Sequence, residues 1–549
     1  MSALDSTALK PLLWLAIALV FVTGLAQRAT RLQDPLLTQS EARQLPRDGG
    51  DEVSASGELP AFGIGAKVWV RMAGSEVSRL RWPTLFAAAL TMILAAWVSW
   101  RLQGALGALL TLLLLAWHGP IIESGQEFGT ASIAQALGLA ILLSLDGLVR
   151  SERRTWLPLV LLVSSAALGM ATSWVFWALA LAVILDLWHR ALASSWRLVE
   201  GLRTFLVVTA LALSLAPLAV AARFHLPGRA GPGLIEGLAG GFLWSRPGPY
   251  ELPAGLKYAF AASCLALLFV AWIRDTARAN PEPPLRALPV LPKGSLRVAI
   301  GLGIIGGFMT ALPLMRAEPS NRFFYLASTL TPLLVWWPAH QLAKRSVSVH
   351  RQLNRLPRVF RRAGSPIVRP ALLALVFTLL GTWLLGGRPL RHLTPLLPLY
   401  VILIVQGLGA LPSLLPRSLG RSLAVIFVAA WLALAATGLG AFRDPNAVEV
   451  ERFALMEDWL NELAPDDLVV LRRTLALRAA RHALAGHDRQ IVDRDYAAGL
   501  AGAGSRRIFV LTAEGAEATR EVESHLASRV LESDRKAGGW RLRRFAALR

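Results

Sequence analysis

Apolar residues gather in long runs up to about residue 442, and short polar segments separate each run from the next. Each run holds about twenty residues, which at 1.5 Å of helical rise per residue matches the roughly 30 Å hydrocarbon core of a bilayer. Because that core offers no partner to a free backbone amide or carbonyl group, each run is expected to form a helix. The pattern predicts about thirteen membrane spans. They cover residues 11–27, 83–100, 104–120, 131–149, 155–170, 172–188, 203–222, 254–273, 297–315, 322–342, 369–386, 391–413 and 420–441.

The charge pattern predicts how these spans are oriented. The formal net charge is +21, yet the basic residues gather in alternate loops between the spans, which is typical of membrane topology and argues against a nucleic-acid partner. The basic loops hold Arg150, Arg153 and Arg154; Arg190, Arg197 and Arg203; Arg274, Arg278, Arg286 and Lys293; Lys344, Arg345, Arg351, Arg355, Arg358, Arg361 and Arg362; and Arg417 and Arg421. We therefore expect a cytoplasmic N-terminus and, after an odd number of spans, a periplasmic or extracellular C-terminus. The high Arg, Ala and Leu content is typical of a GC-rich bacterium, so the predicted location is a bacterial inner membrane.

Two domains follow from the change in composition near residue 443. Residues 1–442 are expected to form a helical membrane domain with two long outer loops, over 28–82 and 223–253. Long loops are candidates for function because short ones are enough to connect helices. Residues 443–549 are more charged and predict a small soluble α/β domain on the outer face. Its expected elements are helices over 447–463, 473–485 and 514–528 and strands over Leu468–Leu471, Gln490–Val492, Ile508–Leu511 and Trp540–Phe545.

The sequence predicts no metal and no other cofactor. Cys264 is the single cysteine, and the nine histidines show no spacing typical of a metal site. The C-terminal segment has no glycine-rich nucleotide-binding motif. Among the isolated charges, Glu76 is expected to pair with Arg79 or Arg81, and Asp186 is expected to pair with or snorkel beside the basic residues that follow it.

Several short segments are each weak motifs, but the order in which they occur along the chain is more specific than any one of them. Thr38–Arg43 reads T-Q-S-E-A-R, and Gly57–Ala61 precedes an expected amphipathic helix over Val68–Met72. Gly74–Pro83 leads into the second span, and Arg388–Pro398 reads R-P-L-R-H-L-T-P-L-L-P. This order, with the span count and the outer soluble domain, resembles the membrane glycosyltransferases of the GT-C fold. The resemblance is closest to family 39, which includes protein O-mannosyltransferases, and to the aminoarabinose transferases of lipid A.

The resemblance implies transfer of a sugar from a polyprenyl-phosphate carrier to a protein or lipid acceptor on the outer face. Glu41 would act as general base on the acceptor hydroxyl, helped by Asp34 or Glu127. Arg388 and Arg391 would hold the donor phosphate. The remaining candidate substrate-binding residues are Glu127, Arg246, Tyr250 and His392.

The sequence departs from the family pattern at positions that are expected to take part in catalysis in the family. These departures leave two interpretations open. Ser40 stands where the family has the first acid of its pair, and His392 follows Arg391 where the family has Tyr. Either the protein is an active transferase with substituted acids, or it is an inactive scaffold that binds a lipid-linked ligand or serves as a subunit of a membrane complex. A transporter is disfavoured because the chain shows no inverted repeat.

Overall fold

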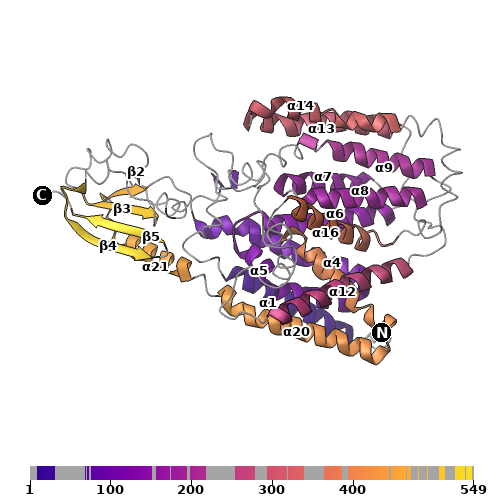
Figure 1. Ribbon diagram of the computed structural model, residues 1–549, viewed down its shortest axis with the longest axis horizontal. Helices are drawn as coiled ribbons and strands as arrows, with labels where there is room; N and C mark the ends of the chain where they lie inside the picture. Colours follow the sequence, from indigo (N-terminus) through magenta and orange to yellow (C-terminus); the bar gives the residue numbers. More distant parts are fainter. Residues whose placement is uncertain are drawn as a thin grey trace.

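The computed structural model describes most of the predicted helical and strand segments. These are residues 9–30, 76–150, 156–173, 175–193, 198–214, 254–278, 294–317, 319–338, 364–385, 394–443, 447–464, 466–471, 506–513, 526–537 and 539–546, with a few isolated positions between them. Within them, a helical bundle is joined to a small β-sheet that lies at one end of it (Figure 1). We call this end of the bundle the sheet end.

Most helices of the bundle overlap the predicted spans, whereas α5 was not predicted and the spans expected over 322–342 and 391–413 are divided into shorter helices. They are α1 (Leu9–Ala29), α4 (Val77–Ala116), α5 (Gly119–Gln126), α6 (Ala131–Arg150), α7 (Trp156–Thr172), α8 (Val175–Ala193), α9 (Leu198–Leu213), α12 (Ala254–Arg278), α13 (Ser295–Ala317), α14 (Arg322–Ser328), α16 (Val368–Leu385), α18 (Leu397–Leu408), α19 (Leu411–Leu414) and α20 (Arg417–Arg443). Among the described residues, five segments are long and apolar enough to cross a membrane. They are Pro11–Ala29, Val77–Ala116, Ala131–Arg150, Ser295–Arg316 and Thr394–Leu414.

The longest of these segments is a helical hairpin. Gly104 has φ 75° and ψ −165° inside α4, a conformation that glycine adopts without steric cost. Thr111 Oγ1 donates a hydrogen bond to Ser99 Oγ at 2.6 Å, although twelve residues of straight helix would separate them by about 18 Å. The two halves of α4 therefore lie antiparallel, as the two predicted spans over 83–100 and 104–120 require.

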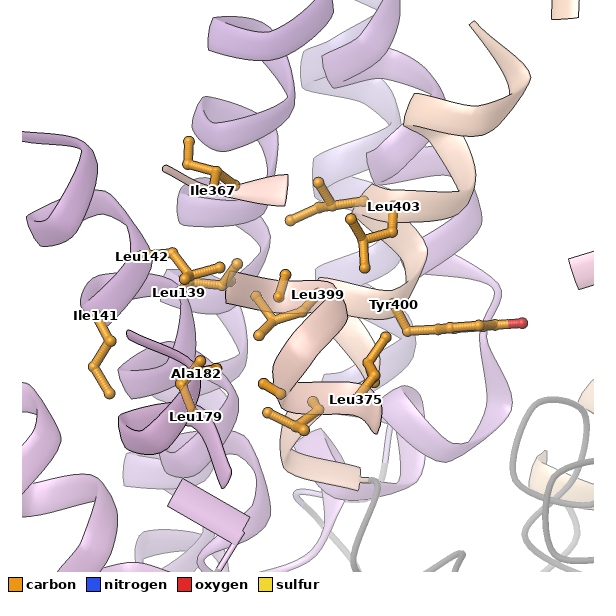
Figure 2. Close-up of a cluster of buried hydrophobic side chains, with 14 of the residues drawn as sticks. Leu139, Ile141, Leu142, Leu179, Ala182, Ile367, Leu375, Leu399, Tyr400 and Leu403 are labelled. Atoms are coloured by element: carbon orange, nitrogen blue, oxygen red, sulfur yellow. The ribbon is translucent and has the colours of Figure 1, made fainter. Parts of the chain in front are cut away.

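The centre of the bundle is α18, in which every residue is buried. Figure 2 shows Leu399 and Leu403 of this helix near Leu142 of α6, Leu179 of α8 and Leu375 of α16, within one buried apolar cluster. A helix that is apolar on all sides is expected where other helices surround it.

We expect Gly407→Ala to destabilise the bundle by about 1–3 kcal/mol, the usual cost of overpacking a core. A Cβ at Gly407 would lie 2.3 Å from the carbonyl oxygen of Leu267 in α12, and backbone cannot move aside cheaply. Gly301→Ala in α13 is the matched control, since a Cβ there meets nothing within 4 Å. Denaturant titration in detergent measures the free energy of unfolding of both variants. Equal stability of the two variants would contradict the close packing of α12 on α18.

The span expected over 322–342 is interrupted. Short α14 is followed by the 3-10 helix η2 (Thr331–Val335), and helix resumes at residues 336–338. Pro332 lacks a backbone N–H and cannot continue the hydrogen-bonding pattern of α14. Thr331 Oγ1 instead donates to the carbonyl of Leu213 at 3.0 Å, which ties the break to α9. Periodicity alone does not reveal such a break, because the run stays apolar through it.

The sheet has the strand order β2-β1-β3-β5-β4. Its strands are β1 (Leu468–Leu471), β2 (Ile491–Val492), β3 (Ile508–Ala513), β4 (Leu531–Ala537) and β5 (Trp540–Phe545). Strand β1 pairs in parallel with β2 and β3, whereas β5 is antiparallel to β3 and β4. The four predicted strands are present.

Strand β4 was not predicted, because its sequence L-E-S-D-R-K-A has no apolar alternation. It is an edge strand held by charge pairs with β5. Arg541 donates to Asp534 at 2.7 Å, and this contact lowers the pKa of the Asp534 carboxyl. Charged side chains at a sheet edge also discourage pairing with another chain.

Helix α21 (Ala447–Glu462) covers one face of the sheet and joins it to the bundle. Its buried residues Met456 and Trp459 share an apolar cluster with strand residues and with Val77, Leu80 and Phe128 of the bundle. The first turn of α4 and the segment after α5 therefore pack against the C-terminal sheet and its helix.

Candidate functional site

Arg28, in the last turn of α1, is buried at the sheet end of the bundle. Its side chain is 1% exposed. Nη1 donates to the carbonyl of Gly24 at 2.7 Å, and Nη2 donates to that of Leu115 at 2.9 Å. Leu115 lies in the last turn of α4, where the helix dipole places partial negative charge on the carbonyl groups. Arg28 thus joins the end of α1 to the end of the α4 hairpin.

Helix α5 lies against the end of α1. A Cβ at Gly125 would lie 3.0 Å from Cδ of Arg28, so only a glycine admits the arginine stem without displacement. Gln126 Nε2 donates to the carbonyl of Gln27 at 2.9 Å and to Thr30 Oγ1 at 3.1 Å. The segment that begins the long first outer loop is therefore held against α5.

Ser124 connects α5 to α6 and to a segment much later in the sequence. Ser132 Oγ donates to the Ser124 carbonyl at 2.5 Å, and Gln135 Nε2 donates to Ser124 Oγ at 3.0 Å. The same Gln135 amide donates to the carbonyl of Thr394 at 3.1 Å. Thr394 begins the 3-10 helix η4 (Thr394–Leu396), directly after Arg391 and the two residues that follow it. One buried amide thus links Ser124 of α5 to Thr394, which lies within the Arg388–Pro398 segment.

Of the predicted site residues, Glu127 lies within the described part of the chain. It is half-buried and directly follows α5, where its backbone N–H donates to the carbonyl of Glu123 at 3.1 Å. The other predicted residues lie outside the described residues, and their roles stay predictions. These are Asp34, Glu41, Arg246, Tyr250, Arg388, Arg391 and His392.

Phe128, the neighbour of Glu127, is buried in the cluster that joins the bundle to α21 and the sheet. We expect Phe128→Ala to cost about 3–5 kcal/mol of packing there. The expected result is faster amide exchange in residues 123–130 and in α21, measured by hydrogen–deuterium exchange of the full chain.

The matched control is Phe323→Ala, because that ring is 76% exposed. In Phe323→Ala, amide exchange in residues 123–130 and in α21 should equal that of the wild type. Unchanged exchange in Phe128→Ala would contradict the idea that the sheet domain holds the Glu127 segment in place.

The start of α4 bears out the expected pairing of Glu76. Arg79 Nε lies 2.6 Å from a Glu76 carboxylate oxygen. Trp69 Nε1 donates to the Arg79 carbonyl at 3.1 Å, which fixes a helical segment that includes residues 68, 69, 71 and 72. Val68 and Met72 expose their side chains, as an amphipathic helix at a membrane surface would.

The polar groups at the sheet end include residues that the sequence did not single out. Arg28 directly follows the predicted first span over 11–27, whereas in the structure it lies inside α1 and is buried. The sequence does contain one sign of the role of Arg28, because a cation inside a membrane span usually has a functional role or a specific partner. Gln135 and Ser124 gave no signal, because neutral polar residues are common in such helices. Among the described residues, no group of three or more His, Cys, Asp or Glu side chains could hold a metal ion.

Comparison with known proteins gives similarity at the level of structure. No family model and no curated protein matches the chain. The chain is similar to a crystal structure of ArnT from Cupriavidus metallidurans in the apo state, with 12% identity, 98% of each chain covered and a TM-score of 0.41. It is also similar to the structure of that protein bound to undecaprenyl phosphate, with 13% identity, 98% of each chain covered and a TM-score of 0.38.

Proposed function

We propose that the protein is a membrane glycosyltransferase that moves a sugar from a polyprenyl-phosphate donor to a protein or lipid acceptor on the outer face. One observation carries the proposal: the contacts from Gln135 to Ser124 and to Thr394. They hold Ser124, three residues before Glu127, close to Thr394, three residues after Arg391. A lipid-linked donor needs this combination, a carboxylate for the acceptor and cations for the phosphate, at one membrane surface.

In the proposed reaction, Glu41 accepts the proton of the acceptor hydroxyl as its oxygen attacks the anomeric carbon of the sugar. Asp34 or Glu127 supports the developing charge. The bond between that carbon and the phosphate oxygen breaks, and polyprenyl phosphate leaves with both electrons of that bond. Arg388 and Arg391 stabilise the leaving phosphate. Contacts from Arg246, Tyr250 and His392 would complete donor binding.

A second function rests on Ser40. A serine hydroxyl cannot act as a base near neutral pH, so loss of the first acid favours a scaffold that binds the lipid-linked ligand without transferring the sugar. Such a protein would serve as an accessory subunit of a membrane complex.

Transfer from a panel of radiolabelled polyprenyl-phosphate sugars to membrane extracts distinguishes the two functions. The full chain, purified in detergent, is compared with the same protein after heat inactivation. Labelled product formed only by the native protein would support the transferase. No product with any donor, from protein shown to be folded, would reject the transferase and favour the accessory subunit.

A further inference from the structure

A pair of arginines shares one carboxylate at the end of the bundle opposite the sheet. Arg101 lies just before the Gly104 turn of α4, and Asp146 and Arg150 lie in the last turns of α6. Arg101 Nη1 is 2.6 Å from one oxygen of Asp146, and Arg150 Nε is 2.7 Å from the other. Asp146 is fully buried, whereas the arginine side chains are 35% and 41% exposed. The cluster is thus open to its surroundings on its cationic side.

The charge of this cluster is unbalanced. Two guanidinium groups against one carboxylate leave one positive charge in excess. By contrast, a second cluster contains Asp186 and Arg190 of α8, Asp275 of α12 and Arg369 at the start of α16, which are two cations and two carboxylates. Among the described residues, Asp146 is the carboxylate that contacts both arginines, so the excess positive charge is available to an external anion.

The free side of the cluster has the donors that a phosphate group needs. Guanidinium carries five N–H donors in a planar fork that matches phosphate oxygens. Asp146 takes one nitrogen of each arginine, Nη1 of Arg101 and Nε of Arg150. The guanidinium carbon of Arg101 also lies 5.5 Å from the centre of the Trp97 ring, which orients the group.

The surroundings of the cluster point to a lipid rather than a soluble anion. Trp97 and Trp100 on the same helix are each about half exposed. Trp14 of α1 packs edge-on against Trp100, with ring centroids 6.0 Å apart, and is also exposed. Tryptophan side chains concentrate where the hydrocarbon core meets the headgroups. Arg101 and Arg150 would then lie at the depth of lipid phosphates.

We propose that Arg101 and Arg150, oriented by Asp146 and flanked by Trp97 and Trp100, form a binding site for the phosphate headgroup of an anionic phospholipid. The site lies at the opposite end of the bundle from the proposed sugar-transfer site and does not depend on it. By the predicted topology, the lipid belongs to the cytoplasmic leaflet.

The cleanest variant is Arg150→Gln, because it removes the excess charge and leaves the pair of Arg101 with Asp146 intact. The matched control is Arg421→Gln, which removes one exposed arginine from α20. The full chain in detergent is titrated with phosphatidylglycerol and with phosphatidylcholine, and bound lipid is counted by native mass spectrometry. A thermal unfolding curve of each variant shows that it is folded.

We expect the wild type to retain phosphatidylglycerol over phosphatidylcholine and Arg150→Gln to lower that preference about fivefold, the effect of one charge near a membrane surface. Arg421→Gln should leave it within about twofold. If both variants lose the preference for phosphatidylglycerol to the same extent, the proposal is wrong, because the lipid is then attracted by the overall positive charge and not by this site. Displacement of the lipid by millimolar glycerol phosphate would also overturn it, since the site would then bind a soluble anion.

Discussion

Replacing Asp186 by asparagine is expected to destabilise the membrane bundle by about 3–5 kcal/mol, the usual cost of breaking a buried ion pair. Asp186 is fully buried, and the side chain of its partner Arg190 is 9% exposed. Arg190 Nε lies 2.6 Å from the Asp186 carboxylate, and its Nη2 donates to the carbonyl of Gly364 at 2.7 Å. Without the Asp186 carboxylate, the buried Arg190 loses its direct ion pair and keeps the carbonyl of Gly364 as its hydrogen-bond acceptor.

Unfolding by a denaturing detergent, followed by circular dichroism, measures this loss. The double variant Asp186→Leu with Arg190→Met is the informative control, because it removes both charges together and should recover most of the stability. Glu76→Gln breaks a pair whose side chains are 55% and 64% exposed, and it should cost less than about 1 kcal/mol. A single Asp186→Asn variant no less stable than the double variant would contradict this account of the pair.

Replacing Glu41 by glutamine is expected to lower sugar transfer by about 10²–10⁴-fold, the usual contribution of a general base. Glutamine keeps the size of the side chain but cannot accept the proton of the acceptor hydroxyl. Donor binding should be unchanged, because Arg388 and Arg391 are proposed to hold the phosphate. The measurement is the initial rate of labelled product formation at saturating donor.

Glu76→Gln is the matched control for this prediction also. Glu76 belongs to the same outer segment but is exposed and paired with Arg79, so its removal should change the rate by less than about twofold. Glu127→Gln should reduce the rate by less than Glu41→Gln if Glu127 only supports the base. If Glu127→Gln lowers the rate of sugar transfer more than Glu41→Gln does, Glu127 rather than Glu41 is the general base.

The helices could be read from the sequence because the bilayer leaves apolar runs few alternatives. Helix α6 over Ala131–Arg150 agrees with the predicted 131–149, and the Gly104 hairpin agrees with two adjacent spans. The break after α14 falls at Pro332, and its contact with α9 through Thr331 and Leu213 is not revealed by apolar periodicity. The charged edge strand β4 was missed for a similar reason, since its partner strand, rather than its own sequence, stabilises it.

The candidate site was less accessible to sequence reasoning. The predicted site residues came from short motifs that resemble a known family, and most of them are carboxylates and arginines in loops. Of these residues, Glu127 lies in the described part of the chain. The side chains that hold this end together are Arg28, Ser124 and Gln135. They act through helix carbonyls and through residues hundreds of positions away, such as Thr394. Such contacts come from the packing of the bundle, and no spacing in the sequence encodes them.

Binding of the donor carrier tests the central claim most directly, because the active enzyme and the inactive scaffold both require it. Native mass spectrometry of the purified full chain with a polyprenyl phosphate would show whether one molecule is retained. The account predicts one bound carrier in the wild type and in Glu41→Gln, and its loss when Arg388 and Arg391 are both changed to glutamine. Failure of the wild type to retain polyprenyl phosphate better than phosphatidylcholine would contradict both forms of the proposed function.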